Sequence, residues 1–282
     1  MAELWKGAPA AQSLTEALEL RTARLRENGI TPTLAIVRLG ERPEDLAYER
    51  GALSRCGKAG VTVRQFLLPA DADQIHLLEI LQRINGDSGI HGCLLFRPLP
   101  PHIDDDAVRQ VLSPAKDVDG ITDGSLAGVF SGASLGFPPC TAQACLELLR
   151  HYGCSPAGKR VVVVGRSLVI GRPVSMLLLR ENATVTICHT KTRDMAALCR
   201  EADILIVAAG KPGVVDASFV SPGQVILDVG VNAAPDGRLV GDVDFPAVEP
   251  IVAAITPVPG GVGAMTSTVL CAHVVEAAEK LL

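Results

Sequence analysis

Short apolar runs alternate with segments of helical periodicity along nearly the whole chain, and this alternation limits the possible folds more than any other feature. Three runs of strand length lie in the first half of the sequence: "TLAIVRLG", "VTVRQFLLP" and "IHGCLLFRPLPP". Helical segments separate them, so we expect parallel strands joined by right-handed crossovers. The alternation therefore predicts an α/β fold built on a parallel sheet.

The pattern begins again near residue 138, which predicts a second α/β unit. Four further candidates for buried strands lie there: "KRVVVVGRS", "ATVTICHT", "DILIVAAG" and "QVILDVG". The closing stretch "MTSTVLCAHVVEAAEKLL" has the pattern of a long helix. Two α/β units favour a ligand cleft at their boundary, near the carboxyl ends of the strands.

Start and stop signals predict several helix ends. Ser13 and Glu16 match a capping box, which predicts that the first helix begins at Ser13. The helix that carries Tyr48 is expected to end near Gly60. A later helix has Pro173 in its first turn, where proline is tolerated.

Composition argues against several classes of protein. The 282 residues carry a net charge of -5 without a run of Lys and Arg, so we do not expect a nucleic-acid binder. No apolar stretch reaches the roughly 20 residues of a membrane span, and no signal peptide is evident. The eight cysteines have irregular spacings without a CxxC pair, so no zinc or other metal site is predicted. We expect a soluble, reduced, cytoplasmic protein without membrane contact.

A glycine turn follows the first strand of the second unit. That strand runs into Gly165, Arg166 and Ser167, and Gly171 precedes the next helical stretch. Glycine at a strand end lets the backbone approach a phosphate, and the following helix presents free N–H groups to it. The spacing departs from G-x-G-x-x-G, so an ordinary strand–helix turn is an equal alternative.

The end of the next strand bears on the choice of cofactor. NAD-binding units usually place Asp or Glu there to hold the ribose 2′-hydroxyl. Here the strand runs into "HTKTR" (189–193), with no acid before Asp194. Hydroxyl and basic groups suit a 2′-phosphate, and Arg166 adds positive charge. The sequence therefore favours NADP over NAD, with a solvated basic turn as the alternative.

Seven stretches, taken together, resemble one known family. They are "KDVDG" (116–120), "PPCT" (138–141), "GRSLVIGRP" (165–173), "TVTICHTKT" (184–192), "LDVGVN" (227–232), "GDVDF" (241–245) and "TPVPGGVGAMT" (256–266). In this order and spacing they are similar to the methylenetetrahydrofolate dehydrogenase/cyclohydrolase (FolD) family, and the similarity runs nearly end to end. The chain departs from the last motif at Ala264, where the family usually has proline.

The resemblance implies a two-domain α/β architecture. Residues 1–137 and 265–282 would form an N-terminal catalytic, folate-binding domain completed by the C-terminal helix. Residues 138–264 would form an inserted Rossmann-like NADP-binding domain. The implied substrate is a tetrahydrofolate derivative in the cleft, the implied cofactor is NADP, and the implied assembly is a homodimer.

The resemblance also assigns site residues. Those expected to contact the cofactor are Gly165, Arg166, Ser167, Gly171, His189, Thr190 and Lys191, with Thr190 where serine is common. Asp119 matches the aspartate that hydrogen-bonds the pterin ring, and Tyr48 matches the tyrosine that lines the substrate. The turn that bounds the folate pocket is matched by Pro259, Gly260 and Gly261. Without the resemblance, the sequence favours a turn cap for Asp119 and a partly buried packing residue for Tyr48.

Departures from the family cluster around Tyr48. The family lysine four residues after the tyrosine is Ala52, and a serine three residues before it is Asp45. The family glutamine is Phe96, with Arg97 beside it. The nearest cations are Arg50, Arg55 and Lys58. Arg50 and Arg55 lie off the helix face that carries Tyr48, and Lys58 lies more than one turn further along the helix.

These departures affect the two steps of the family chemistry differently. The dehydrogenase step moves a hydride and no proton, so positioning does most of the work. The cyclohydrolase step needs water attack, proton loss and C–N cleavage, to which a general acid or base contributes about 10²–10⁴-fold. Alanine and phenylalanine transfer no proton, and a dry pocket protects the methenyl cation. We interpret the chain as an NADP-dependent 5,10-methylenetetrahydrofolate dehydrogenase with weak or absent cyclohydrolase activity.

Two alternatives stay open. In the first, Asp45 or Arg97 replaces the lost proton-transfer group and both activities remain. Asp45 lies one turn before Tyr48, within reach of the pocket. In the second, the chain is a non-catalytic regulator that binds folate or nucleotide. The intact nicotinamide-side motifs count against this second alternative.

Overall fold

The computed structural model describes residues 1–282, and they form two compact units. The three-stranded unit comprises residues 12–140 and 267–282, and the six-stranded unit comprises residues 1–11 and 141–266. Each is an α/β unit with a parallel sheet. The predicted α/β class with two units is therefore confirmed.

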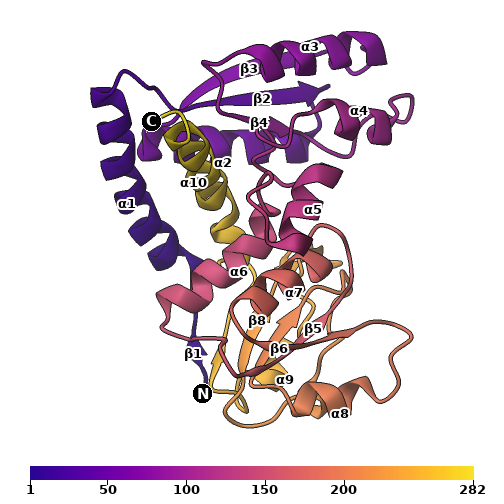
Figure 1. Cartoon of the computed structure of the whole chain (residues 1–282). Helices are drawn as coiled ribbons and strands as arrows, with labels where there is room; N and C mark the ends of the chain where they lie inside the picture. The colour runs from indigo at the N-terminus through magenta and orange to yellow at the C-terminus, as the bar shows by residue number, and fades with distance from the viewer. The chain divides into compact units, whose positions relative to one another are not determined.

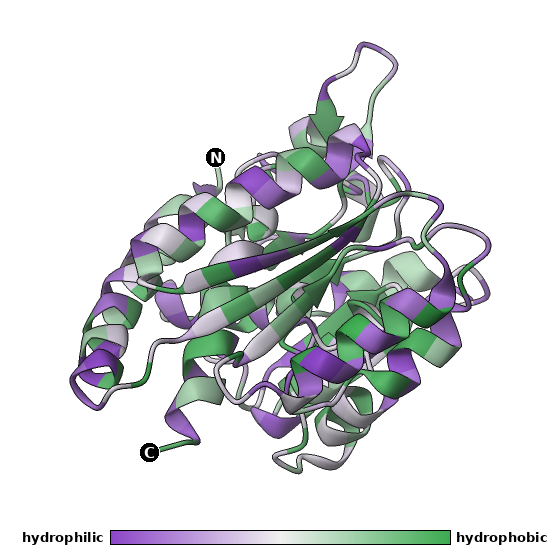
Figure 2. Cartoon of the chain, turned by 90° about the horizontal axis from the view of Figure 1, so that it is seen from above, coloured by the Kyte–Doolittle hydropathy of each residue, from purple (hydrophilic) through white to green (hydrophobic).

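The sheet of the three-stranded unit has the order β3-β2-β4, and both pairings are parallel. Its strands are β2 (Thr33–Leu39), β3 (Thr62–Leu68) and β4 (Gly92–Leu95). All seven residues of the central strand β2 are buried, which explains why its sequence is apolar apart from Thr33 and Arg38. In Figure 2 the strands are green in their apolar stretches and purple at polar residues, and the helices carry both colours throughout.

Helices cover both faces of this sheet (Figure 1). They are α1 (Gly7–Glu27, shared with the other unit), α2 (Pro43–Ala59), α3 (Gln74–Gly86), α4 (Asp105–Val111), α5 (Asp123–Ser131) and α10 (Thr266–Glu279). Helix α3 begins where Asp73 accepts a hydrogen bond from the His76 N–H at 2.7 Å. Its buried positions recur every three or four residues, and Leu77, Leu81 and Ile84 pack on the sheet. Burying each such side chain stabilises the fold by about 1.5–3 kcal/mol.

The sheet of the six-stranded unit has the order β1-β11-β8-β7-β5-β6, again parallel throughout. Its strands are β1 (Glu3–Leu4), β5 (Arg160–Val164), β6 (Thr184–Cys188), β7 (Ile204–Val207), β8 (Val225–Asp228) and β11 (Ala254–Ile255). The helices are α6 (Cys140–His151), α7 (Gly171–Arg180), α8 (Met195–Arg200) and α9 (Phe245–Val248). A short antiparallel hairpin joins β9 (Asn232–Ala233) and β10 (Leu239–Val240).

The predicted capping box is wrong, because helix α1 begins at Gly7 and Ser13 lies inside it. The preceding stretch "GAPAAQ" explains the longer helix. Alanine is the best helix former, and Pro9 lies in the first turn, where its missing N–H costs nothing.

The expected domain boundaries differ from the two units at the N-terminus, because residues 1–11 belong to the six-stranded unit. Strand β1 pairs with β11, and Trp5 stacks on Tyr152 with ring centroids 4.7 Å apart. Residues 1–11 are thus held in the six-stranded unit by a strand pairing at the sheet edge and by an aromatic stack. No local sequence pattern predicts either contact. No helix of this chain is long and apolar enough to span a membrane.

Candidate active site

Helix α2 carries two of the predicted site residues, Tyr48 and Ala52. It begins at Pro43, whose fixed φ suits a first turn, and ends at Gly60, which has a φ of 73°. The end near Gly60 agrees with the prediction. Tyr48 is 37% exposed and Ala52 is 1% exposed, so only the tyrosine presents a polar group at the surface of this unit.

Phe96 follows β4 and lies against Tyr48. Its backbone N–H donates to the Val37 carbonyl at 2.9 Å, which continues the β2–β4 pairing by one residue. The Phe96 side chain is buried, and its ring meets the Tyr48 ring edge to face, with centroids 5.7 Å apart. The wall beside Tyr48 is therefore aromatic, and the adjoining α2 position is only a methyl group.

Asp119 lies on a loop that another aspartate shapes. The fully buried Asp117 accepts hydrogen bonds from Ile121 N, Thr122 N and Ser125 Oγ at 3.0, 2.8 and 2.6 Å. Gly120 has a φ of 67°, and a Cβ atom there would collide with the backbone between Pro138 and Pro139. The motif "KDVDG" thus supplies one structural carboxylate, Asp117, and a second one, Asp119, that contacts Cys140.

Electrostatics separate the two polar groups of this site. Burial raises the pKa of Asp119 to about 6, opposed by a hydrogen bond with Cys140 and by the Arg97 charge. Desolvation of the hydroxyl and the nearby Asp119 carboxylate raise the pKa of Tyr48 well above its ordinary value. Near neutral pH, Tyr48 is therefore a neutral phenol, and Asp119 is mostly ionised.

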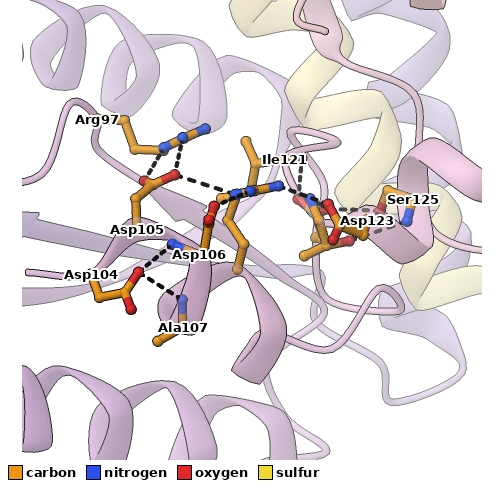
Figure 3. A network of polar contacts seen from close by, with 11 residues as sticks. Arg97, Asp104, Asp105, Asp106, Ala107, Ile121, Asp123 and Ser125 are labelled. Atoms are coloured by element: carbon orange, nitrogen blue, oxygen red, sulfur yellow. Dashed lines mark hydrogen bonds and ion pairs between the residues drawn. The ribbon is translucent and has the colours of Figure 1, made fainter.

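The two residues considered as substitutes for the missing lysine are both ion-paired. Arg42 holds the Asp45 carboxylate with two hydrogen bonds, of 2.7 and 3.0 Å. Arg97 binds Asp105 of α4 through both ends of its guanidinium, and Figure 3 shows this arrangement. Arg109 extends the network from Asp105. The Arg97 guanidinium is thus directed to α4.

A buried ion pair joins strand β2 to helix α2, and the sequence did not predict it. Arg38 and Glu49 are each 4% exposed, and Arg38 Nε donates to Glu49 Oε2 at 2.8 Å. Gln65 donates to the other Glu49 oxygen at 2.5 Å. The only sequence signal was the single arginine inside the apolar run of β2. Glu49 is therefore committed to the interior, although it is adjacent to Tyr48 in sequence.

The glycine turn of the six-stranded unit has the geometry of a phosphate-binding turn. Gly165 has a φ of 128°, and a Cβ atom there would collide with the Ala208 carbonyl. A Cβ atom on Gly171 would likewise collide with the Gly165 carbonyl. Arg166 and Ser167 are exposed between them, and helix α7 begins at Gly171 without a side-chain cap. Free N–H groups at a helix N-terminus suit a phosphate, so the residues present fit a dinucleotide.

The predicted basic turn lies at the same edge of the sheet. Val164 and Cys188 are paired in register at the ends of β5 and β6, so the turns that follow them are neighbours. The His189 N–H donates to Thr192 Oγ1 at 2.9 Å, and the Lys191 N–H donates to His189 Nδ1 at 3.1 Å. These bonds fix the turn and leave Thr190 and Lys191 exposed.

A pocket of about 310 Å³ lies at the ends of β8 and β11. Its lining includes Pro259, Gly260 and Gly261 on one side and residues 228–231 on the other. The structure thus brings the predicted turn together with the "LDVGVN" motif. Tyr48, Ala52, Phe96 and Asp119 belong to the three-stranded unit.

Two buried aspartates shape the loops around this pocket, and the sequence analysis assigned them no role. Asp228 accepts hydrogen bonds from the backbone of residues 230, 242 and 243, and burial raises its pKa to about 6. Asp242 accepts from the Asn232 side chain and from three successive N–H groups, those of Ala209, Gly210 and Lys211. A Cβ atom on Gly241 would collide with Asp228, which explains the glycine in "GDVDF".

Comparisons with known proteins agree along the whole chain. The family model described as tetrahydrofolate dehydrogenase/cyclohydrolase, catalytic domain, matches residues 5–119, and that of the NAD(P)-binding domain matches residues 139–282. The bifunctional protein FolD of Carboxydothermus hydrogenoformans is 49% identical over 283 residues, which cover 100% of this chain and 99% of the relative.

Solved structures show the same similarity. The bifunctional enzyme FolD from Campylobacter jejuni superposes with a TM-score of 0.96 at 35% identity, covering 100% of both chains. The Trypanosoma brucei enzyme, solved with NADP cofactor and an inhibitor, has a TM-score of 0.91 at 35% identity, covering 99% of this chain and 98% of that one.

Proposed function

Because this chain belongs to the tetrahydrofolate dehydrogenase/cyclohydrolase family and is an NADP-dependent methylenetetrahydrofolate dehydrogenase, we propose that its cyclohydrolase activity is weak or absent. The observation that carries the proposal is the pair Ala52 and Phe96 beside Tyr48. The three-stranded unit would hold the folate, and the six-stranded unit would hold NADP.

The dehydrogenase reaction needs orientation more than proton transfer. Bound NADP would supply the hydride acceptor for the methylene carbon of 5,10-methylenetetrahydrofolate, and the folate product would be a cation spread over two nitrogens. Asp119 would accept hydrogen bonds from the pterin ring, and its pKa of about 6 keeps most of it ionised near pH 7. The neutral Tyr48 ring would lie against the bound folate, and its contact with Phe96 would hold the ring in place. Such fixed geometry is the main source of rate in a step without proton movement.

The cofactor would be held by the two neighbouring turns of the six-stranded unit. The N-terminus of α7, with Gly165, Ser167 and Gly171, would face the pyrophosphate. Arg166 and the 189–191 turn, which carries Lys191 and no acid, would bind the 2′-phosphate.

The cyclohydrolase reaction lacks its proton-transfer group in this pocket. Ala52 is a buried methyl group, and Phe96 offers no hydrogen bond to water. Asp45 is bound to Arg42 and Glu49 to Arg38, so neither carboxylate is free to serve as a base. Arg97 is bound to Asp105 through both ends of its guanidinium, so it is not free for this role either. An apolar wall also keeps water from the methenyl cation.

A second candidate function is the full bifunctional activity, since the relatives are named bifunctional. Asp45 would then have to leave Arg42 and act as the base from one turn below Tyr48. The family resemblance further suggests a homodimer, which light scattering of the purified protein would test.

Two rates on the purified protein test the proposal. The first is NADP reduction with 5,10-methylenetetrahydrofolate, and the second is loss of 5,10-methenyltetrahydrofolate absorbance above the buffer blank. We expect fast reduction with hydrolysis at the blank rate. Comparable rates for the two steps would refute the proposal and favour the second candidate.

A further inference from the structure

Two cysteines from distant parts of the chain meet in the interior of the three-stranded unit. Cys56 lies on α2 and Cys271 on α10, and their sulfur atoms are 3.6 Å apart. Both side chains are fully buried. Figure 1 shows the two helices next to each other on one side of the sheet. The contact therefore joins the helix of Tyr48 to the C-terminal helix.

The two thiols differ chemically. The contact with Cys271 lowers the pKa of Cys56, because a hydrogen bond from the neighbouring thiol stabilises the Cys56 thiolate. The same contact raises the pKa of Cys271 well above its ordinary value. Thiolate is the reactive form of cysteine, so Cys56 is the better nucleophile of the pair.

A disulfide between Cys56 and Cys271 requires a small movement of α2 toward α10. A disulfide needs a sulfur–sulfur distance of about 2.05 Å, so the helices must approach by roughly 1.5 Å. Gly51 and Gly57 are exposed positions of α2, on either side of Cys56 in the sequence. Glycine inside a helix lowers its stability by about 1 kcal/mol relative to alanine, which favours local adjustment.

We propose that Cys56 and Cys271 are a redox-sensitive dithiol site that forms a reversible disulfide with a small peroxide as oxidant. The Cys56 thiolate attacks hydrogen peroxide, forms a sulfenic acid and releases hydroxide. The Cys271 thiol then attacks the sulfenic sulfur, the S–O bond breaks and water leaves. In sum, two thiols and one peroxide give one disulfide and two waters.

The site is placed to affect the substrate pocket. Cys56 lies four residues after Ala52 and eight after Tyr48, two turns along the same helix. A shift of α2 toward α10 moves Tyr48 relative to Phe96 and Asp119. Misplacing reacting groups by about 1 Å can cost on the order of 10²-fold in rate. We therefore expect the oxidised enzyme to lose most of its dehydrogenase activity and thiol reductants to restore it.

Peptide mapping and thiol counting test the site directly. The reduced protein has eight free cysteines. After treatment of the folded protein with hydrogen peroxide, we expect the loss of two thiols and a non-reduced peptide that links Cys56 to Cys271. In Cys271→Ala we expect loss of one thiol and trapping of a sulfenic acid on Cys56 by dimedone. In Cys145→Ala, a buried control in the other unit, the linked peptide should still form.

The proposal is overturned if Cys56 and Cys271 stay reduced in the folded protein, or if they are linked only after unfolding. The activity measurement rests on the proposed dehydrogenase function, but thiol counting does not. Failure of the disulfide proposal can therefore be told apart from failure of the proposed function. Loss of activity that persists in the Cys56→Ala variant would mean that the disulfide does not control the pocket.

Discussion

The Tyr48 and Phe96 rings meet edge to face, with their planes inclined by 69° and their centroids 5.7 Å apart. By the family resemblance, Phe96 stands where relatives have a glutamine. Its ring holds the Tyr48 side chain from that side. An edge-to-face pair contributes about 0.5–1.5 kcal/mol beyond burial, so Phe96 stabilises the orientation of Tyr48 while it excludes water. We therefore expect Phe96 to support the orientation of Tyr48 without offering a hydrogen bond to water.

Restoring the family pair should restore the second activity. We expect the Ala52→Lys, Phe96→Gln double variant to hydrolyse 5,10-methenyltetrahydrofolate about 10²–10⁴-fold faster than the parent, because a proton-transfer group returns beside Tyr48. Loss of methenyl absorbance measures the rate. The Ala52→Met, Phe96→Gln variant is a matched control that fills the same space without an amine. An equal gain in this control would show that water access, and not proton transfer, limits hydrolysis.

Asp45 should have no part in methenyl hydrolysis, because Arg42 holds its carboxylate. We expect Asp45→Asn to leave the hydrolysis rate unchanged at the blank level. The dehydrogenase kcat should change little, since the residue lies at the start of α2. A measurable parental hydrolysis that disappears in Asp45→Asn would instead identify Asp45 as the substitute base.

The pKa of about 6 at Asp119 predicts a pH dependence of substrate binding. As the pH falls through about 6, the carboxylate takes up a proton and loses its capacity to accept two hydrogen bonds from the pterin. The KM for the folate should therefore rise below pH 6. In Asp119→Asn this rise should disappear, with a weaker KM at every pH. Asp228 also has a pKa of about 6, and a rise that persists in Asp119→Asn would assign the pH dependence to Asp228 instead.

Arg166 should set the preference for NADP. Hydrogen bonds to a charged group contribute about 1.5–3 kcal/mol, so Arg166→Gln should raise the KM for NADP by about 10–100-fold. The KM for NAD, which lacks the 2′-phosphate, should change little. Arg180→Gln, at the far end of α7, is the charge-matched control. Equal losses for both cofactors would place Arg166 at the pyrophosphate instead.

Much of the fold was predictable because its pattern is local. Buried parallel strands such as β2 and β5 are continuous apolar runs, and glycines such as Gly60 mark helix ends. The start of α1 was not predictable from Ser13, since an alanine-rich stretch extends the helix backwards. Local sequence also holds no trace of the β1–β11 pairing.

The features of the candidate site also fall into two groups, those that local sequence predicts and those that it does not. The Tyr48–Ala52 spacing follows from the helix alone, and the turns after β5 and β6 are neighbours because parallel strands share an edge. The partners of charged groups depend on long-range packing instead. Only the structure shows that Arg97 binds Asp105 and that Cys56 meets Cys271 across 215 residues.

The most direct test of the account follows both products in one reaction. The enzyme is mixed with 5,10-methylenetetrahydrofolate and NADP, and the absorbances of NADPH and of 5,10-methenyltetrahydrofolate are recorded together. We predict one methenyl product for each NADPH, followed by decay at the rate of the enzyme-free blank. NADPH that appears without methenyl accumulation, while 10-formyltetrahydrofolate forms, would contradict the account.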